Sequence, residues 1–228
     1  MTGHIRTRRR TSSTPSHGRP PAVDVPPTIW AGGTEPIEAD TQWPTQIVSR
    51  AVIEFSRPGD QVTVVPSPAP TARRRRRFLT PDTKAALTTI ENLGRSSVIE
   101  HLAAGPATPR TPAPSEDGKI SLILASLLPP ENTSLSVVDQ IVTLAATRLA
   151  SGGVLVVFTR ATHTPAGALL DPTGHVVSAG QTADLLFLQH IVAAPISDDT
   201  IVAPAPDTAG QARGHIVVHT DVTVLLRP

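Results

Sequence analysis

The sequence predicts an open three-layer α/β domain whose sheet is mostly parallel and closes with a C-terminal antiparallel β-hairpin. Helical segments alternate with short β-branched strands, which is typical of βαβ units. Residues 119–125 (KISLILA) form a nearly continuous apolar run, as expected for a central strand buried on both faces of a parallel sheet. The last two predicted strands, residues 186–193 and 215–226, have no helix between them, so we expect them to pair antiparallel at one sheet edge.

The first half of the chain contains two predicted helix–strand pairs. Residues 45–55 carry apolar side chains at helical spacing, and the turn RPGD that follows leads into a strand over residues 61–65. Thr-Pro-Asp then predicts the start of a helix over residues 80–93, which Gly94 closes. Residues 95–100 (RSSVIE) predict a second strand, which ends on an acid.

The second half begins with residues 103–118, which are rich in Pro, Ala and Thr and predict a loop or a degenerate βα unit. An apolar stripe predicts a helix over residues 133–150, and residues 151–153 (Ser-Gly-Gly) predict its C-terminal cap. A buried strand is expected over residues 154–159, followed by a helix over residues 176–185.

Composition excludes several classes of chemistry. The chain has 228 residues, a mass of 23.9 kDa, a formal net charge of +1 and no cysteine. Disulfides, cysteine nucleophiles, iron–sulfur clusters and thiolate zinc sites are therefore excluded. No apolar stretch approaches the ~20 residues of a membrane helix, and the basic N-terminus lacks the apolar segment of a secretory signal. We therefore expect a soluble cytoplasmic protein with no membrane partner.

The basic residues are concentrated in two places. The first is residues 1–25, which predict a disordered basic tail ahead of a domain spanning residues 26–228. The second is a run of five arginines: the domain has a net charge of −3 with this run and −8 without it. Because clustered arginines bind phosphates by releasing counterions, DNA is a possible partner. The candidate nucleic-acid contacts are Arg8, Arg9, Arg10, Arg73, Arg74, Arg75, Arg76 and Arg77.

Five separated patches resemble the S-adenosylmethionine-dependent DNA amino-methyltransferases. Residues 53–65 (IEFSRPGDQVTVV) are similar to the helix, turn and first strand that precede the family's glycine-rich motif. The family's second strand, with the residues before it, is similar to residues 91–100 (ENLGRSSVIE). The start of one of its later strands is similar to residues 150–160 (ASGGVLVVFTR). Residues 28–30 (TIW) resemble the family's start, and residues 183–192 and 219–228 resemble its closing strands. The resemblance implies a Rossmann-like methyltransferase domain with S-adenosylmethionine as its cofactor.

The cofactor loop departs from the family pattern. The resemblance assigns Glu100 to the cofactor ribose and keeps Thr71, but Pro68 and Pro70 stand where the family has glycines. Proline has no N–H to donate and cannot adopt a positive φ, so we expect this loop not to form the usual cradle. The sequence also has Val64 where the family has aspartate.

The catalytic loop is altered as well. Family members carry a polar residue, two prolines and an aromatic after the central strand, where the aromatic stacks on a flipped base. Here Ser126 keeps the polar position, the prolines are displaced and no aromatic follows. Ser126 is either a weak substrate contact or a turn residue. Two hypotheses remain: a catalytically degenerate protein that binds nucleic acid or a partner, and an active DNA amino-methyltransferase with an atypical cofactor loop.

The remaining polar residues do not predict a metal site or a nucleophile triad. His215 and His219 are about 13 Å apart if both lie on one strand, which is too far for a metal pair. His163, His175 and His190 are scattered along the chain and predict surface or hydrogen-bonded core positions. The acidic pairs 116–117 and 198–199 predict solvated turns.

Overall fold

The computed structural model describes residues 28–38, 40–67, 79–102, 120–128, 134–164, 166–198, 200–203 and 218–228. These residues form a mixed α/β fold around a seven-stranded sheet with the order β1-β8-β11-β5-β4-β2-β3. The sheet is parallel except for β11, so the predicted Rossmann-like fold class is confirmed. The seven strands are β1 (Ile29–Ala31), β2 (Gln61–Val65), β3 (Ser96–Ile99), β4 (Ile120–Ser126), β5 (Leu149–Thr159), β8 (Leu186–Ala194) and β11 (Thr220–Leu226).

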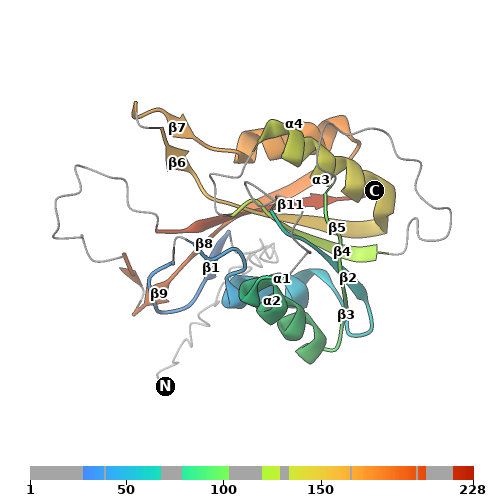
Figure 1. Ribbon diagram of the computed structural model, residues 1–228, viewed down its shortest axis with the longest axis horizontal. Helices are drawn as coiled ribbons and strands as arrows, with labels where there is room; N and C mark the ends of the chain where they lie inside the picture. The colour runs from blue at the N-terminus through green and yellow to red at the C-terminus, as the bar shows by residue number, and fades with distance from the viewer. Residues whose placement is uncertain are drawn as a thin grey trace, which may run out of the picture.

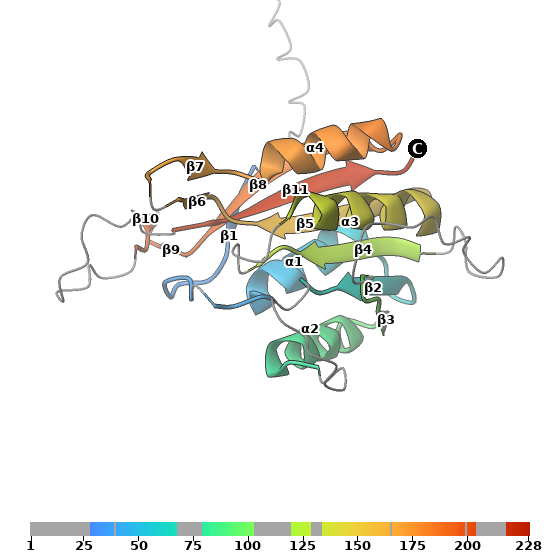
Figure 2. The same cartoon turned by 45° about the horizontal axis from the view of Figure 1, so that its top comes forward.

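Helices cover both faces of the sheet (Figure 1). Helices α1 (Thr45–Phe55) and α2 (Pro81–Asn92) pack on one face, and α3 (Leu135–Arg148) and α4 (Thr173–Thr182) pack on the other. The turned view in Figure 2 shows the same three layers, with α3 and α4 above the sheet and α1 and α2 below it. Two short hairpins lie outside the main sheet: β6 (Thr162–His163) with β7 (Leu169–Leu170), and β9 (Ile196–Ser197) with β10 (Thr200–Ile201).

The predicted local signals shape α1 and α2. Apolar residues of α1 at helical spacing are buried against the sheet, among them Ile47, Val48 and Val52. The Thr80 side chain accepts the Thr83 N–H as an N-cap, and Gly94 ends α2 with a φ of +79°. These features confirm the helix boundaries expected from the sequence.

The C-terminal strand lies elsewhere than expected. β11 is antiparallel to both of its neighbours and is inserted between β5 and β8, so it is an interior strand. The expected antiparallel pairing with β8 is therefore confirmed, but the expected position at a sheet edge is wrong. The edge beside β8 is formed by β1, a three-residue strand in which Trp30 is buried and which the sequence did not predict.

The Ser-Gly-Gly segment is not a helix cap. Helix α3 ends at Arg148, and residues 151–153 belong to the first part of β5. Gly152 has a φ of +78°, and its N–H donates to the Arg227 carbonyl at 2.8 Å. The glycines therefore allow β5 to pair closely with both of its neighbours, which corrects the expected C-cap. Helix α4 also begins and ends about three residues earlier than the predicted span.

Candidate functional site at the carboxyl edge of the sheet

The strand order creates a topological switch point between β2 and β4. From β2 the chain moves outward to β3, whereas β4 and β5 lie on the opposite side of β2. Helix α2 crosses on one face and α3 on the other (Figure 1). In open α/β sheets, ligands bind outside the carboxyl ends of the strands at such a point. The carboxyl ends of β2 and β4, which are level at Val65 and Ala125, therefore define the candidate site.

A segment that precedes α1 crosses this edge; we call it the strap, residues 40–43. Asp82, in the first turn of α2, accepts the Gln42 N–H at 2.7 Å and the Trp43 N–H at 2.9 Å through Oδ2. Ser126, at the end of β4, donates its hydroxyl to the Gln42 carbonyl at 2.7 Å. Side chains from two separate elements thus hold the backbone of the strap across the switch point.

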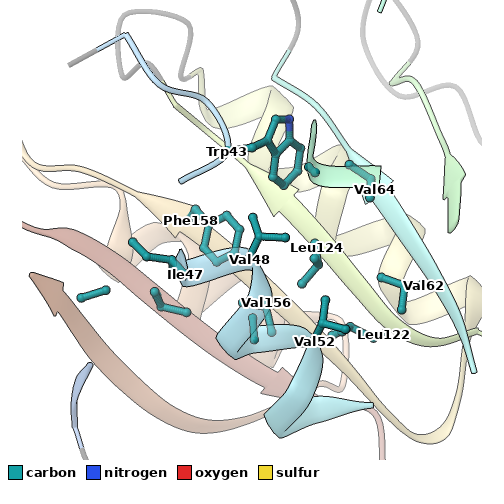
Figure 3. Close-up of a cluster of buried hydrophobic side chains, with 14 of the residues drawn as sticks. Trp43, Ile47, Val48, Val52, Val62, Val64, Leu122, Leu124, Val156 and Phe158 are labelled. Atoms are coloured by element: carbon teal, nitrogen blue, oxygen red, sulfur yellow. The ribbon is translucent and has the colours of Figure 1, made fainter. Parts of the chain in front are cut away.

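The Trp43 indole fills the space beneath the strap. It is 1% exposed and stands edge-on to Phe158, with ring centroids 6.0 Å apart and an interplanar angle of 81°. Figure 3 shows the indole at the end of the β4 arrow, above Phe158 and beside Val64 of β2. Its Nε1 atom is buried and has no hydrogen-bond partner among the described residues, and the same is true of the Ser67 hydroxyl after β2. Trp43 therefore occupies the candidate site as an apolar plug.

Arg160 follows β5 and holds the chain just before the strap. Its guanidinium donates from Nη1 to the Glu38 carbonyl at 3.1 Å and from Nε to the Thr220 hydroxyl at 3.2 Å. The side chain is 2% exposed, and burial lowers the pKa of Arg160 from 12.5 to about 10. The group therefore remains a cation at neutral pH, and it ties the strap region to β5 and β11.

Ser126, the candidate substrate contact, is fully buried. Besides donating to Gln42, its oxygen accepts the Leu128 N–H at 3.2 Å, which is the local pattern of a turn residue. Both hydrogen-bonding functions of the hydroxyl are thus engaged within the chain. A substrate could contact the Ser126 hydroxyl only if the strap moved away from it.

Glu100, the candidate ribose contact, follows β3 at the same edge of the sheet. Both of its carboxylate oxygens lie 3.3 Å from Nη2 of Arg148, the last residue of α3. The two side chains are 29% and 16% exposed, so the ion pair is partly shielded from water. Glu100 therefore balances a cation of its own chain, a role that the sequence did not indicate.

We expect Glu100→Gln to lower the free energy of unfolding by about 1 kcal/mol, because the partly buried Arg148 loses its carboxylate partner. The matched control is Glu54→Gln in the exposed Arg50–Glu54 pair of α1, which should cost at most about 0.5 kcal/mol. Urea unfolding followed by tryptophan fluorescence measures both. Equal effects of the two substitutions would contradict a stabilising role for the Glu100–Arg148 pair.

Several predicted site residues lie outside the described part of the chain. These are the loop positions Pro68, Pro70 and Thr71, the arginines 8–10 and 73–77, and the segment 103–118. Val64, which stands where the resemblance expects aspartate, is described and lies fully buried in the core between β3 and β4. Strand β2 therefore has no acidic side chain at this position.

A polar cluster that the sequence did not reveal lies on β8 and β11. The Asp221 carboxylate is 8% exposed and lies 2.9 Å from Nε2 of His190 and 3.4 Å from Nε2 of His219. His190 is thus hydrogen-bonded, as predicted. The cluster was missed because residues 31 positions apart meet only through the antiparallel β8–β11 pairing.

Two classes of site find no support in the described residues. No group of three or more His, Asp or Glu side chains in these ranges is arranged to hold a metal ion. Among the same residues, no helix is both long enough and apolar enough to cross a membrane.

Comparison with protein-family models and with curated proteins gives no match. Among solved structures, the chain is similar to the Haloferax volcanii partner of the Trm112 methyltransferase activator, with 13% identity, a TM-score of 0.45, and coverage of 83% of this chain and 90% of that one. It is also similar to geranyl diphosphate C-methyltransferase from Streptomyces coelicolor A3(2), with 10% identity, a TM-score of 0.44, and coverage of 79% and 77%.

A protein named as a DNA modification methylase, from Thermus thermophilus, is 10% identical, with a TM-score of 0.32 and coverage of 79% of this chain and 50% of that one. The similar structures are thus methyltransferases of several kinds, some of them described as dependent on S-adenosylmethionine, and they do not single out the DNA amino-methyltransferases. At these identities the likeness concerns the fold, and no residue role is carried over from it.

Proposed function

We propose that this chain is a DNA methyltransferase-like protein that has lost catalysis and acts as a nucleic-acid-binding or partner-binding module. The observation that carries the proposal is that its own residues engage both candidate site residues. The Ser126 hydroxyl is bonded to the strap, and the Glu100 carboxylate is paired with Arg148. A catalytic site needs such groups free to meet the cofactor and the methyl acceptor.

The sequence of the cofactor loop supports the same proposal. Methyltransferases of this fold hold S-adenosylmethionine on a glycine-rich loop and on the N-terminus of the next helix, where backbone N–H groups are available. Here Pro68 and Pro70 remove donors from that loop. In addition, Asp82 places a carboxylate in the first turn of α2 and uses it to bind the strap. These features leave few backbone N–H donors for the cofactor.

The arginine segments provide the second half of the proposal. The runs at positions 8–10 and 73–77 concentrate positive charge, and the second run follows β2, whose carboxyl end borders the switch point. Contacts from arginine to phosphates fix a protein on DNA without reading its sequence. We therefore propose that duplex DNA is bound through phosphate contacts and independently of the buried candidate site.

Binding to a short mixed-sequence duplex should weaken steeply between about 50 and about 200 mM salt, with a log–log slope of about −0.9 for each phosphate contact. Replacing arginines 73–77 by glutamine should make the slope shallower by up to about 4.5, which is about 0.9 for each of the five. Fluorescence polarisation measures both values. The control is Arg57→Gln, a single exposed arginine in the turn after α1, which should change the slope by less than about 1. Binding that is absent or insensitive to salt would refute the DNA half of the proposal.

Calorimetric titration with S-adenosylmethionine tests the loss of catalysis. We expect no binding heat at micromolar protein, because the prolines remove backbone donors from the loop and the strap occupies Ser126 and Asp82. The alternative function, an active DNA amino-methyltransferase with an atypical loop, rests on Glu100 at the end of β3 and predicts a dissociation constant of about 1 µM. That affinity in the parent chain would favour the alternative.

A further inference from the structure

We propose that the strap, residues 40–43, is an autoinhibitory gate that closes the switch point from within the chain. Its two backbone tethers, Asp82 and Ser126, come from two different elements, and the Trp43 indole lies buried at the carboxyl end of β4, beside Val64 of β2. The inference rests on the proposed lack of cofactor binding in the parent chain, and it gives that lack a structural cause.

The tethers contact only the backbone of the strap. Asp82 accepts two consecutive N–H groups, and Ser126 donates to the carbonyl between them. Contacts of this kind are few and lie at one end of the segment, so their loss can free the strap without disturbing the β-ladder beneath it. At the other end, Arg160 holds the Glu38 carbonyl and gives the segment a fixed point on which to turn.

The side chain that the strap carries is not fully satisfied in the closed state. Within the described part of the chain, the Trp43 Nε1–H is buried and has no acceptor, and the Ser67 hydroxyl after β2 is also buried without a partner. A buried donor without a partner disfavours the state that buries it, because the same group is hydrogen-bonded when exposed to water. The unpaired donor thus lowers the stability of the closed state, which the burial of the indole and the Asp82 and Ser126 hydrogen bonds maintain.

Opening would expose the groups that a ligand needs at this point of the fold. The Ser126 hydroxyl would no longer donate to Gln42, and the Asp82 carboxylate would no longer accept the N–H groups of the strap. The Trp43 indole would leave its place against Phe158. A ligand at the switch point and the closed strap therefore exclude each other. The apparent affinity of the ligand is therefore its intrinsic affinity multiplied by the fraction of molecules in which the strap is open.

Trp43 itself reports the state of the gate. The chain has two tryptophans and no tyrosine, so a Trp30→Phe background leaves Trp43 as the sole strong fluorophore. In that background we expect Asp82→Ala to raise the acrylamide quenching of Trp43, because two hydrogen bonds to a carboxylate are lost. The Thr41 backbone N–H donates to the Glu38 carbonyl and not to Asp82. We expect its hydrogen exchange with solvent to become at least about tenfold faster in the variant.

The matched control is Asp171→Ala. Asp171 also uses a carboxylate oxygen to accept a backbone N–H at a helix start, that of Thr173 in α4, and it is exposed on the opposite face of the sheet. We expect it to leave Trp43 quenching unchanged. If Asp82→Ala does not fold, Ser126→Ala removes the other tether and should shift quenching in the same direction. Unchanged quenching in a folded tether variant would overturn the gate.

Titration with S-adenosylmethionine as the probe tests the autoinhibition. We expect the Asp82→Ala variant to bind more tightly than the parent, by the same factor of about ten or more that amide exchange gives for opening. Equal affinity in the two proteins, or no binding in either, would overturn autoinhibition by the strap. Micromolar binding by the parent chain would instead contradict the proposed function, so the two failures are distinguishable.

Discussion

Replacing Trp43 by alanine is expected to lower the free energy of unfolding by about 3–5 kcal/mol. The indole is the largest fully buried side chain of the core, and it joins the strap to Phe158 on β5. Its removal would leave a cavity at the carboxyl edge, where the tethered strap cannot collapse fully. Urea unfolding followed by far-UV circular dichroism measures the change without relying on the tryptophan signal.

The control for size is Trp43→Phe. Phenylalanine keeps a ring against Phe158 and removes the Nε1–H that has no partner, so we expect a loss below about 1.5 kcal/mol. Together the two variants separate the packing of the ring from the cost of its buried donor. A loss of less than about 1 kcal/mol for alanine, a threshold set by typical core truncations, would show that Trp43 does not plug the site.

The position of Trp43 could not be predicted from the sequence. The residue precedes a helix and lies between polar residues and Pro44, a pattern that indicates a surface loop. Its burial depends on Asp82, about 40 positions later, and on Ser126, more than 80 positions later. Single-residue tethers of this kind leave no periodicity or motif, so only the folded chain reveals them.

The local elements could be predicted because each depends on neighbours in the sequence. The apolar stripe of α1, the Thr80-Pro81 start of α2 and the buried run of β4 each reflect short-range physics. The fold class followed from their alternation. β1 was missed because three residues are too few to show an alternating pattern, and its pairing with β8 spans most of the chain.

The candidate site was predicted only in part. Glu100 and Ser126 were identified as residues that end strands, and they do lie at the carboxyl ends of β3 and β4. The partners that engage them were not foreseen, because Arg148 reaches Glu100 from the end of α3. Likewise, β11 was expected at an edge of the sheet. The sequence indicated that β11 pairs with β8, but it did not indicate that the other side of β11 pairs with β5.

The second large effect is expected at Gly153, where alanine should lower the free energy of unfolding by about 1–3 kcal/mol. A Cβ atom there would stand 2.9 Å from two backbone oxygens, those of Ala150 and Ile120. Backbone atoms cannot move aside as the end of a side chain can, so β4 or β5 must shift. The Gly153 carbonyl also accepts the Arg227 N–H at 2.9 Å, so a shift would strain the C-terminal pairing as well.

Thermal unfolding provides the measurement, since each kcal/mol corresponds to a shift in Tm of about 2–4 °C for a chain of this size. The matched control is Gly174→Ala in the first turn of α4, where a Cβ would meet nothing within 4 Å. Alanine there should leave Tm unchanged or raise it, by up to about 1 kcal/mol in stability, because it restricts the unfolded chain. If Gly153→Ala behaved like Gly174→Ala, the close approach of β4 to the start of β5 would be incorrect. The two substitutions add the same methyl group, so their difference isolates backbone crowding at the strand pair that ends in Ser126.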